Sequence, residues 1–318
     1  MREGTYERDI YSSTRDFPLP VEVVDSDVDL YYRIALSMYL EVEAANGAAA
    51  NGAADLHARP DAGPGAAAAP RVRPGRGAGE PADGDAASAR RDCVFIVPVG
   101  PVFQYRRFVW LVKQRPIDLS RLHLFFMDEY LDEQGGLIPE DSPLSFRGFI
   151  QRELIEPMGS TGGFSGERVY FPDPQNPGDF DRRLAELGGA DVCYAGVGIN
   201  GHLAFNEPEG ALSAEDFLQL GTRVVPLSRE TITINSNTAL RGAFEQVPAR
   251  AITVGFRQIM EARKLRIYLN RPWQGAVVRK LLFGDISPSF PASFARRHSD
   301  AALIMTPEVA ERPSFALK

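Results

Sequence analysis

The sequence of 318 residues is poor in cysteine and lacks the paired cysteines of zinc or disulfide motifs. Its two cysteines, Cys93 and Cys193, lie in separate apolar runs, CVFIVPV and DVCYAGVG. No C-x-x-C pair occurs, so neither a structural zinc site nor a disulfide framework is indicated. We therefore expect both cysteines to be small buried residues of strands, and we expect no bound metal.

The sequence also lacks an excess of basic residues and any long apolar run. Acidic residues outnumber basic ones, 42 to 35, which gives a formal net charge of −7. Nucleic acids and acidic membranes bind basic surfaces, so neither is expected as the main partner. No stretch approaches the roughly 18 apolar residues of a membrane span, and the first residues, MREGTYERDIYSSTRDF, are too polar for a secretory signal. We expect a cytoplasmic protein that must hold any anionic ligand through local groups.

Large apolar residues are nearly missing between residues 44 and 91. This segment consists mainly of Ala, Gly, Pro, Asp and Arg; apart from alanine, its aliphatic residues are Leu56 and Val72, and it has no aromatic residue. Such a composition buries too little surface to offset the entropy cost of ordering the chain. We predict a disordered insertion at 44–91 within one α/β domain of residues 20–318, preceded by an N-terminal extension at 1–19.

Outside this insertion, short apolar runs alternate with amphipathic patterns. Residues 27–45 carry apolar side chains at helical spacing, including Leu30, Ile34 and Met38. Continuous apolar runs follow, of the kind found in buried parallel strands, with helical patterns between them. Strands are predicted at 93–99, 122–127, 191–198, 251–256, 265–270 and 301–305, and further helices at 102–114, 144–158 and 274–284. The alternation predicts a three-layer α/β/α sandwich with a mostly parallel, Rossmann-like sheet.

Polar or glycine-containing segments directly follow three of the predicted strands. The first runs into Gly100, the second into Asp128, Glu129 and Tyr130, and the third into a glycine-rich loop with His202. In an open parallel sheet, ligands bind beyond the carboxyl ends of the strands, so these residues are expected in one cleft. An acid, an imidazole and a further carboxylate from the same loop can perform general acid–base catalysis without a metal. Taken alone, each segment has a plain structural explanation, such as a helix cap or a tight turn.

These segments resemble those of glucosamine-6-phosphate deaminases. GVGINGHLAFNEP at 196–208 resembles the family signature G-[IV]-G-x-[DN]-G-H-[IL]-[AG]-F-N-E-P. FFMDEYL at 125–131 and SPLSFRGFI at 142–150 resemble its Asp-Glu-Tyr block, and the segments at 251–269 and 283–305 resemble two later blocks. The related 6-phosphogluconolactonases share the Gly-His turn but usually continue Ala-Ser-Leu-Phe. The resemblance covers most of the chain outside the predicted insertion.

The resemblance implies a reaction without a cofactor, in which an aminosugar ring opens, a proton moves between C2 and C1, and ammonia leaves to give the ketose. Asp128 matches the acid that transfers the proton, His202 the group that opens the ring, and Glu207 the carboxylate that orients the histidine. Asn200, where many members carry Asp, belongs to the same catalytic set. The implied substrate-binding or supporting residues are Gly100, Glu129, Tyr130, Gly198, Gly201 and Asn206.

The sequence departs from the family pattern where a phosphate would bind. The first loop of the family usually reads Pro-[TS]-Gly-x-[TS]-Pro, whereas PVGPVFQY here lacks the hydroxyls, and Pro101 offers no N–H to an anion. Alignment places Asn237 where the family has an arginine and Gln274 where it has a lysine. Either other basic groups hold the substrate or the sugar carries no phosphate at that end. The candidate replacements are Arg229, Arg241 and Arg271.

Three functions remain open from the sequence. The first is an aminosugar deaminase or isomerase that uses Asp128, His202 and Glu207, with glucosamine 6-phosphate as the leading substrate. The second is a sugar lactonase or a biosynthetic isomerase on the same scaffold, although the Asn-Glu-Pro continuation argues against a lactonase. The third is a sugar-binding regulator without catalysis, which Asn200 and the altered phosphate loop suggest. The expected partner is a small sugar in each case, and a homo-oligomer is possible.

Overall fold

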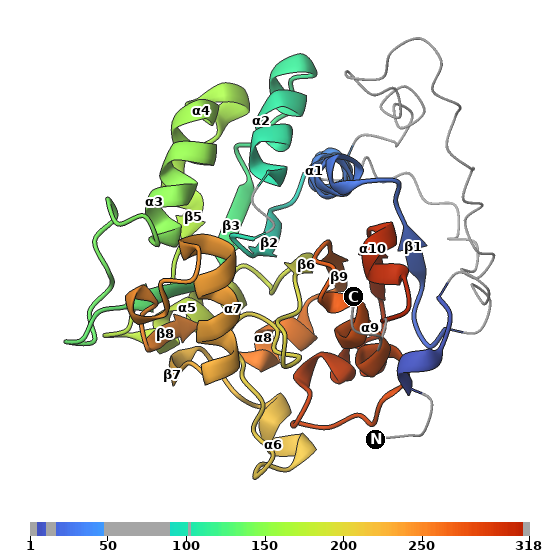
Figure 1. The fold of residues 1–318 in the computed structure, drawn as a ribbon. Helices are drawn as coiled ribbons and strands as arrows, with labels where there is room; N and C mark the ends of the chain where they lie inside the picture. The colour runs from blue at the N-terminus through green and yellow to red at the C-terminus, as the bar shows by residue number, and fades with distance from the viewer. Residues whose placement is uncertain (1–4, 11–16, 48–89, 101–102, 314–318) are drawn as a thin grey trace.

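A parallel sheet forms the centre of the molecule (Figure 1). The computed structural model describes residues 5–10, 17–47, 90–100 and 103–313, so nearly all of the predicted insertion at 44–91 lies outside the described residues. The sheet has seven strands in the order β1-β10-β9-β6-β2-β3-β5, and every neighbouring pair is parallel. The strands are β1 (Val21–Val23), β2 (Cys93–Val97), β3 (Leu122–Phe126), β5 (Val169–Tyr170), β6 (Val192–Ala195), β9 (Lys264–Leu269) and β10 (Ala301–Met305).

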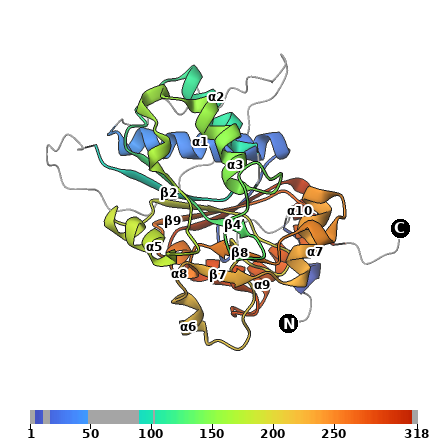
Figure 2. The same cartoon turned by 90° about the vertical axis from the view of Figure 1, so that its left-hand side faces the viewer.

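Helices cover both faces of this sheet, as Figure 2 shows. One face carries α1 (Asp27–Ala45), α2 (Gln104–Gln114) and α3 (Phe146–Ile150), which continues through a π-helical segment (Gln151–Ile155) into α4 (Glu156–Met158). The other face carries α5 (Pro177–Glu186), α8 (Phe256–Glu261), α9 (Gln274–Phe283) and α10 (Pro307–Ala310). None of the described helices is long and apolar enough to cross a membrane. The predicted three-layer α/β/α sandwich is confirmed.

Strand β2 shows why the apolar runs of this sequence are continuous. Val94 and Ile96 point into the core beneath α8 and α9, whereas Phe95 and Val97 point into the core beneath α1 and α2. Because side chains alternate along a strand and both faces are covered, every position must be apolar. Cys93 also lies in this strand; burial raises the pKa of its thiol and keeps it a free, unreactive cysteine.

A second, smaller sheet corrects one prediction. The apolar run at 251–256 was expected to join the parallel sheet, but β8 (Arg250–Thr253) lies between β4 (Asp128–Leu131) and β7 (Arg223–Pro226) in a three-stranded antiparallel sheet. The chain leaves the main sheet at Met127, one residue after β3, and β4 then pairs with β8. Since β8 is buried in this sheet too, its apolar pattern does not reveal which sheet it joins.

The described part of the N-terminal segment packs against the α/β body. Ile10 is fully buried in the core that also contains α9 residues. The buried guanidinium of Arg279 in α9 donates hydrogen bonds to the backbone carbonyls of Arg8, Gly275 and Ala310. One arginine therefore joins the described N-terminal segment, α9 and α10, and Ile10 belongs to the folded body.

Candidate active site

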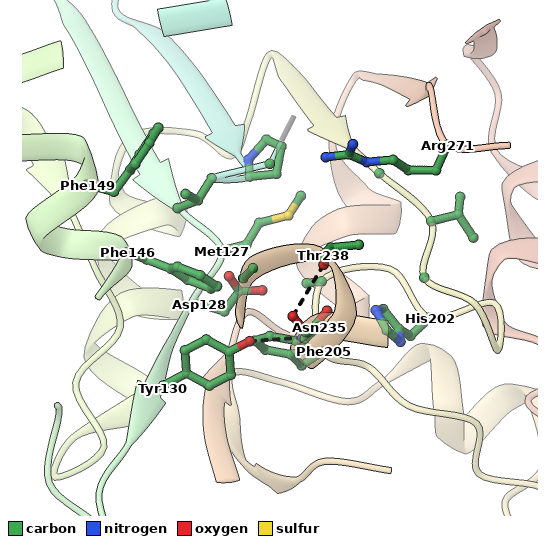
Figure 3. Close-up of a pocket in the computed structure, with 18 of the residues that line it drawn as sticks. Met127, Asp128, Tyr130, Phe146, Phe149, His202, Phe205, Asn235, Thr238 and Arg271 are labelled. Atoms are coloured by element: carbon green, nitrogen blue, oxygen red, sulfur yellow. Dashed lines mark hydrogen bonds between the residues drawn. The ribbon is translucent and has the colours of Figure 1, made fainter. Parts of the chain in front are cut away.

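A cavity of about 400 Å³ opens at the carboxyl ends of the central strands. Its wall combines residues that follow β2, β3, β6 and β9 with side chains from α3 and from α7 (Arg229–Leu240) (Figure 3). This size suits a small-molecule ligand. Of the predicted site residues, the cavity wall contains Gly100, Asp128, Tyr130, Gly198 and His202. Outside the wall lie Glu129, Asn200, Gly201, Asn206 and Glu207.

Hydrogen bonds within the loop after β6 fix the ring of His202. Its Nδ1 lies 2.9 Å from Oδ1 of Asn200. The amide nitrogen of Asn200 donates to Oε2 of Glu207 at 2.5 Å and to Oγ of Ser228 at 3.0 Å, so its oxygen faces the imidazole. Because an amide oxygen only accepts hydrogen bonds, this pattern assigns the proton to Nδ1 of His202. Nε2 is left as a proton acceptor beside the cavity.

Glu207 supplies the negative charge that Asn200 cannot provide. Its Oε2 lies 3.6 Å from Nδ1 of His202, and its Oε1 accepts a hydrogen bond of 3.1 Å from the backbone N–H of Ser228. Burial acts to raise the pKa of Glu207, but hydrogen bonds and the charge of His202 outweigh burial and lower this pKa to about 2. The carboxylate is therefore ionised at neutral pH and places a negative charge behind the imidazole.

Two glycines shape this loop for different reasons. A Cβ atom on Gly198 would lie 2.0 Å from Cε1 of His202, so only glycine leaves room for the imidazole at the cavity wall. Gly201 has a φ of +92°, and a Cβ atom there would lie 2.4 Å from a ring carbon of Phe290. Gly201 therefore serves the turn of the loop. It was expected to bind substrate, but it does not line the cavity.

Asp128 reaches the cavity as the first residue of β4. Figure 3 shows its carboxyl beside Met127 and Phe146 in the cavity wall. The side chain is buried, and no hydrogen bond to its carboxyl is found among the described residues. Burial, and secondly the charge of Glu129, raise the pKa of Asp128 to about 8. This carboxyl is mostly neutral at pH 7, and a nearby cation would favour its ionised form.

Glu129 points away from the cavity because side chains alternate along β4. The residue is fully buried, and its carboxylate accepts hydrogen bonds from Oγ of Ser145 and from the backbone N–H groups of Phe146 and Arg147, at 2.9 to 3.0 Å. These bonds hold the first turn of α3, which places Phe146 and Phe149 in the cavity wall. Glu129 thus supports the wall rather than contacting a ligand.

Of two further predicted substrate-binding residues, Tyr130 lines the cavity and Asn206 does not. Tyr130 lines the cavity, and its hydroxyl accepts a hydrogen bond of 2.9 Å from Nδ2 of Asn235 in α7. Asn206 is fully buried outside the cavity, where its Nδ2 donates to the carbonyl of Val254 and its Oδ1 accepts from the guanidinium of Arg223. Asn206 therefore ties the His202 loop to the smaller sheet, and the prediction that it contacts substrate is not supported by its position.

Several wall residues escaped the sequence analysis because they lie far from the recognised strand ends. Asn235 and Thr238 come from α7, two residues before and one residue after Asn237, which does not line the cavity. Arg271 was only one of three candidate cations, and the structure places neither of the other two in the described wall. The wall residues without a predicted role include Phe146, Phe149, Asn235, Thr238 and Trp273.

The arrangement suits proton transfer. A buried carboxyl and an imidazole of fixed tautomer face one cavity, with a second carboxylate behind the imidazole. Among the described residues, no group of three or more His, Cys, Asp or Glu side chains is placed to hold a metal ion. The side chains themselves can act as general acid and general base on a bound ligand.

Comparison with known proteins decides the family. No protein-family model matches the chain. A relative from Bifidobacterium longum (strain NCC 2705), called glucosamine-6-phosphate deaminase, is 30% identical over 244 residues, which cover 72% of this chain and 84% of the relative. The chain belongs to the glucosamine-6-phosphate deaminase family. A relative of the same name from Clostridium beijerinckii is 30% identical over 212 residues, which cover 65% of this chain and 81% of the relative.

Solved structures of this family and of lactonases share the fold. The structure of a monomeric glucosamine-6-phosphate deaminase matches with a TM-score of 0.59 and 26% identity, over 69% of this chain and 87% of that one. A 6-phosphogluconolactonase from Shewanella baltica matches with a TM-score of 0.57 over 90% of this chain and 97% of that one, but at 15% identity. The second likeness shows the fold alone. The predicted family and fold are confirmed, and the catalytic roles of single residues stay predictions.

Proposed function

We propose that the chain is an aminosugar deaminase, which converts a reducing 2-amino-2-deoxy sugar into the ketose with release of ammonia. The observation that supports this most is that Asp128 and His202, which follow different strands, line the same cavity. The relatives described above carry the name glucosamine-6-phosphate deaminase, so glucosamine 6-phosphate is the first substrate to test.

His202 is the group that opens the sugar ring. Ring opening moves the proton of the anomeric hydroxyl to the ring oxygen, and an imidazole that exchanges protons near neutral pH can perform both transfers. The Nδ1–H of His202 is held by Asn200, so Nε2 carries out the exchange. Glu207 stabilises the imidazolium that forms between the two transfers.

Asp128 is the base that moves the proton from C2 to C1. Its carboxylate removes the C2 proton of the open aldehyde, which gives an enolamine; return of the proton to C1 leaves an imine at C2. Water then adds to this imine and ammonia leaves, so one water is consumed for each ammonia released. A desolvated carboxylate is a stronger base than one in water, and Asp128 is buried.

Ammonia release tests the proposal. The purified chain is incubated with glucosamine 6-phosphate and glucosamine, and ammonia and ketose are measured together. We expect equal amounts of both products. A folded chain that releases no ammonia, or that instead hydrolyses 6-phosphogluconolactone, would contradict the proposed function.

The pH dependence of activity should report on Asp128. Since catalysis needs the ionised carboxylate and burial raises its pKa to about 8, kcat/KM should rise with pH up to about 8. In the complex, the ammonium group of the substrate favours the ionised form of Asp128. The rise of kcat with pH should therefore occur at lower pH than the rise of kcat/KM. Nuclear magnetic resonance of the Asp128 side-chain carbon in the free enzyme separates this titration from that of the substrate amine. A midpoint near pH 4 would contradict the prediction.

A methyl group on Gly198 should disturb His202 without disturbing the fold. The added Cβ would lie within 2.1 Å of Nε2 and Cε1, so the imidazole must move out of its place in the cavity wall. We expect Gly198→Ala to lower kcat by about 100-fold, because misplacing a catalytic group by about 1 Å has effects of this size. Steady-state kinetics measure the loss, and an unchanged melting temperature is the control. Near-normal kcat would show that the ring position is not critical.

A further inference from the structure

One fixed positive charge lies in the described wall of the cavity. Arg271 is the single lysine or arginine among the described residues that form this wall. Figure 3 shows its guanidinium directed into the cavity, on the side away from Tyr130. Among the described residues, no carboxylate forms an ion pair with it. The side chain is exposed, so it is available to a ligand that enters the cavity.

The backbone that carries Arg271 is held in place by Gln274. Oε1 of Gln274 accepts hydrogen bonds from the N–H groups of Asn270 and Arg271, at 3.0 and 2.9 Å. Its Nε2 donates to the carbonyl of Val197 at 2.8 Å. Asn270 in turn donates to the hydroxyl of Tyr31 at 2.9 Å. Gln274, which aligns with the family lysine, uses its amide within the protein and supports the turn that presents Arg271.

The other expected cations do not reach the wall. Arg229 and Arg241 lie at the two ends of α7, and neither is among the described residues that line the cavity. Asn237, which aligns with the family arginine, does not line the cavity and could supply no charge there. The overall net charge of −7 does not attract anions. Among the described wall residues, Arg271 is therefore the one fixed positive charge that an anionic group can meet.

We propose that Arg271 alone determines selectivity for an anionic group, phosphate or carboxylate, at the end of the sugar remote from its amine. This inference rests on the proposed function, since it describes the substrate of the same site. A guanidinium can donate two parallel hydrogen bonds to either anion. Among the described residues, no salt bridge joins Asp128 to Arg271, and Arg271 is not among the causes of the raised pKa of Asp128. The phenylalanine side chains in the wall, such as Phe146 and Phe149, offer the remaining sugar apolar contact surface.

The test compares sugars that differ only at the remote end. Values of kcat/KM are measured for glucosamine 6-phosphate, 2-amino-2-deoxyglucuronic acid and glucosamine, with the unmodified chain, Arg271→Ala and Arg229→Ala. We expect the unmodified chain to prefer at least one charged sugar over glucosamine by about 10- to 100-fold. In Arg271→Ala, the ratio of kcat/KM for the charged sugar to kcat/KM for glucosamine should fall close to one. The matched control Arg229→Ala should keep the ratio of the unmodified chain. The preferred charged sugar identifies the anion.

Several outcomes overturn the proposal. A kcat/KM for glucosamine equal to that for the better charged sugar in the unmodified chain contradicts it. A charged-to-neutral ratio of kcat/KM that persists in Arg271→Ala contradicts it as well. An equal loss for all three sugars in Arg271→Ala would assign the arginine a structural role. If no sugar releases ammonia, the proposed function fails, and calorimetric binding of glucosamine 6-phosphate and glucosamine then decides the inference separately. Equal affinities of the unmodified chain for glucosamine 6-phosphate and glucosamine would contradict the inference about Arg271.

Discussion

Replacing Asp128 by asparagine is expected to remove ammonia release almost completely and to stabilise the folded chain. Asparagine cannot accept the C2 proton, so Asp128→Asn should lose about 10³-fold or more in kcat. The amide has nearly the shape of the carboxyl, so the cavity should keep its form. The variant therefore separates catalysis from folding, which a larger substitution would not do.

The stability gain follows from the raised pKa of Asp128. Its ordinary value of 3.8 applies in the unfolded chain, whereas burial raises it to about 8 in the folded chain. The folded state thus binds the proton more tightly, and ionisation of Asp128 opposes folding increasingly as pH rises from about 4 to about 8. At pH 7 this cost is on the order of a few kcal/mol, and asparagine removes it. The gain should vanish below about pH 4, where both states are protonated.

Thermal unfolding at several pH values measures this effect. We expect the melting temperature of Asp128→Asn to exceed that of the unmodified chain by roughly 5 °C or more at pH 8 and to equal it near pH 4. Asp132→Asn is the matched control, because Asp132 follows the same strand but does not line the cavity. A lower melting temperature for Asp128→Asn at pH 8 would show that the carboxyl is not desolvated in the folded chain.

Substitution of His202 by glutamine should have the second largest effect. Glutamine can form hydrogen bonds but cannot exchange a proton near neutral pH, so the ring-opening step loses its catalyst. We expect His202→Gln to lower kcat by about 10²- to 10⁴-fold with glucosamine 6-phosphate. The uncatalysed opening of the sugar ring then limits turnover, so the residual rate should depend little on Asp128.

The comparison of single and double variants tests this order of events. If ring opening limits His202→Gln, adding a further mild change at Asp128, such as Asp128→Glu, should lower kcat less than it does in the unmodified chain. His123→Gln is the matched control, since His123 is buried in β3 outside the cavity and pairs with Tyr170. Fully multiplicative losses in the double variant would assign His202 to the same step as Asp128.

The local parts of the site could be predicted from the sequence because their geometry is local. The loop at 196–208 contains His202, Asn200 and Glu207 within a few residues, and its glycines allow the tight turn that brings them together. Asp128 follows a strand directly, so its place at the sheet edge was predictable as well. What escaped prediction was that residues 128–131 form a strand. Their alternation directs Asp128 and Tyr130 to the cavity and Glu129 away from it.

By itself, the sequence determined the layers of the fold, the parallel sheet and the family, because apolar periodicity and short motifs are properties of neighbouring residues. Only the tertiary structure decided which strands form the smaller sheet, which face of β4 meets the ligand and which cation remains in the wall. Arg271 and Asp128 are far apart in the chain and meet one cavity only through the packing of β9 beside the central strands. Contacts of this kind depend on long-range packing, which no local pattern encodes.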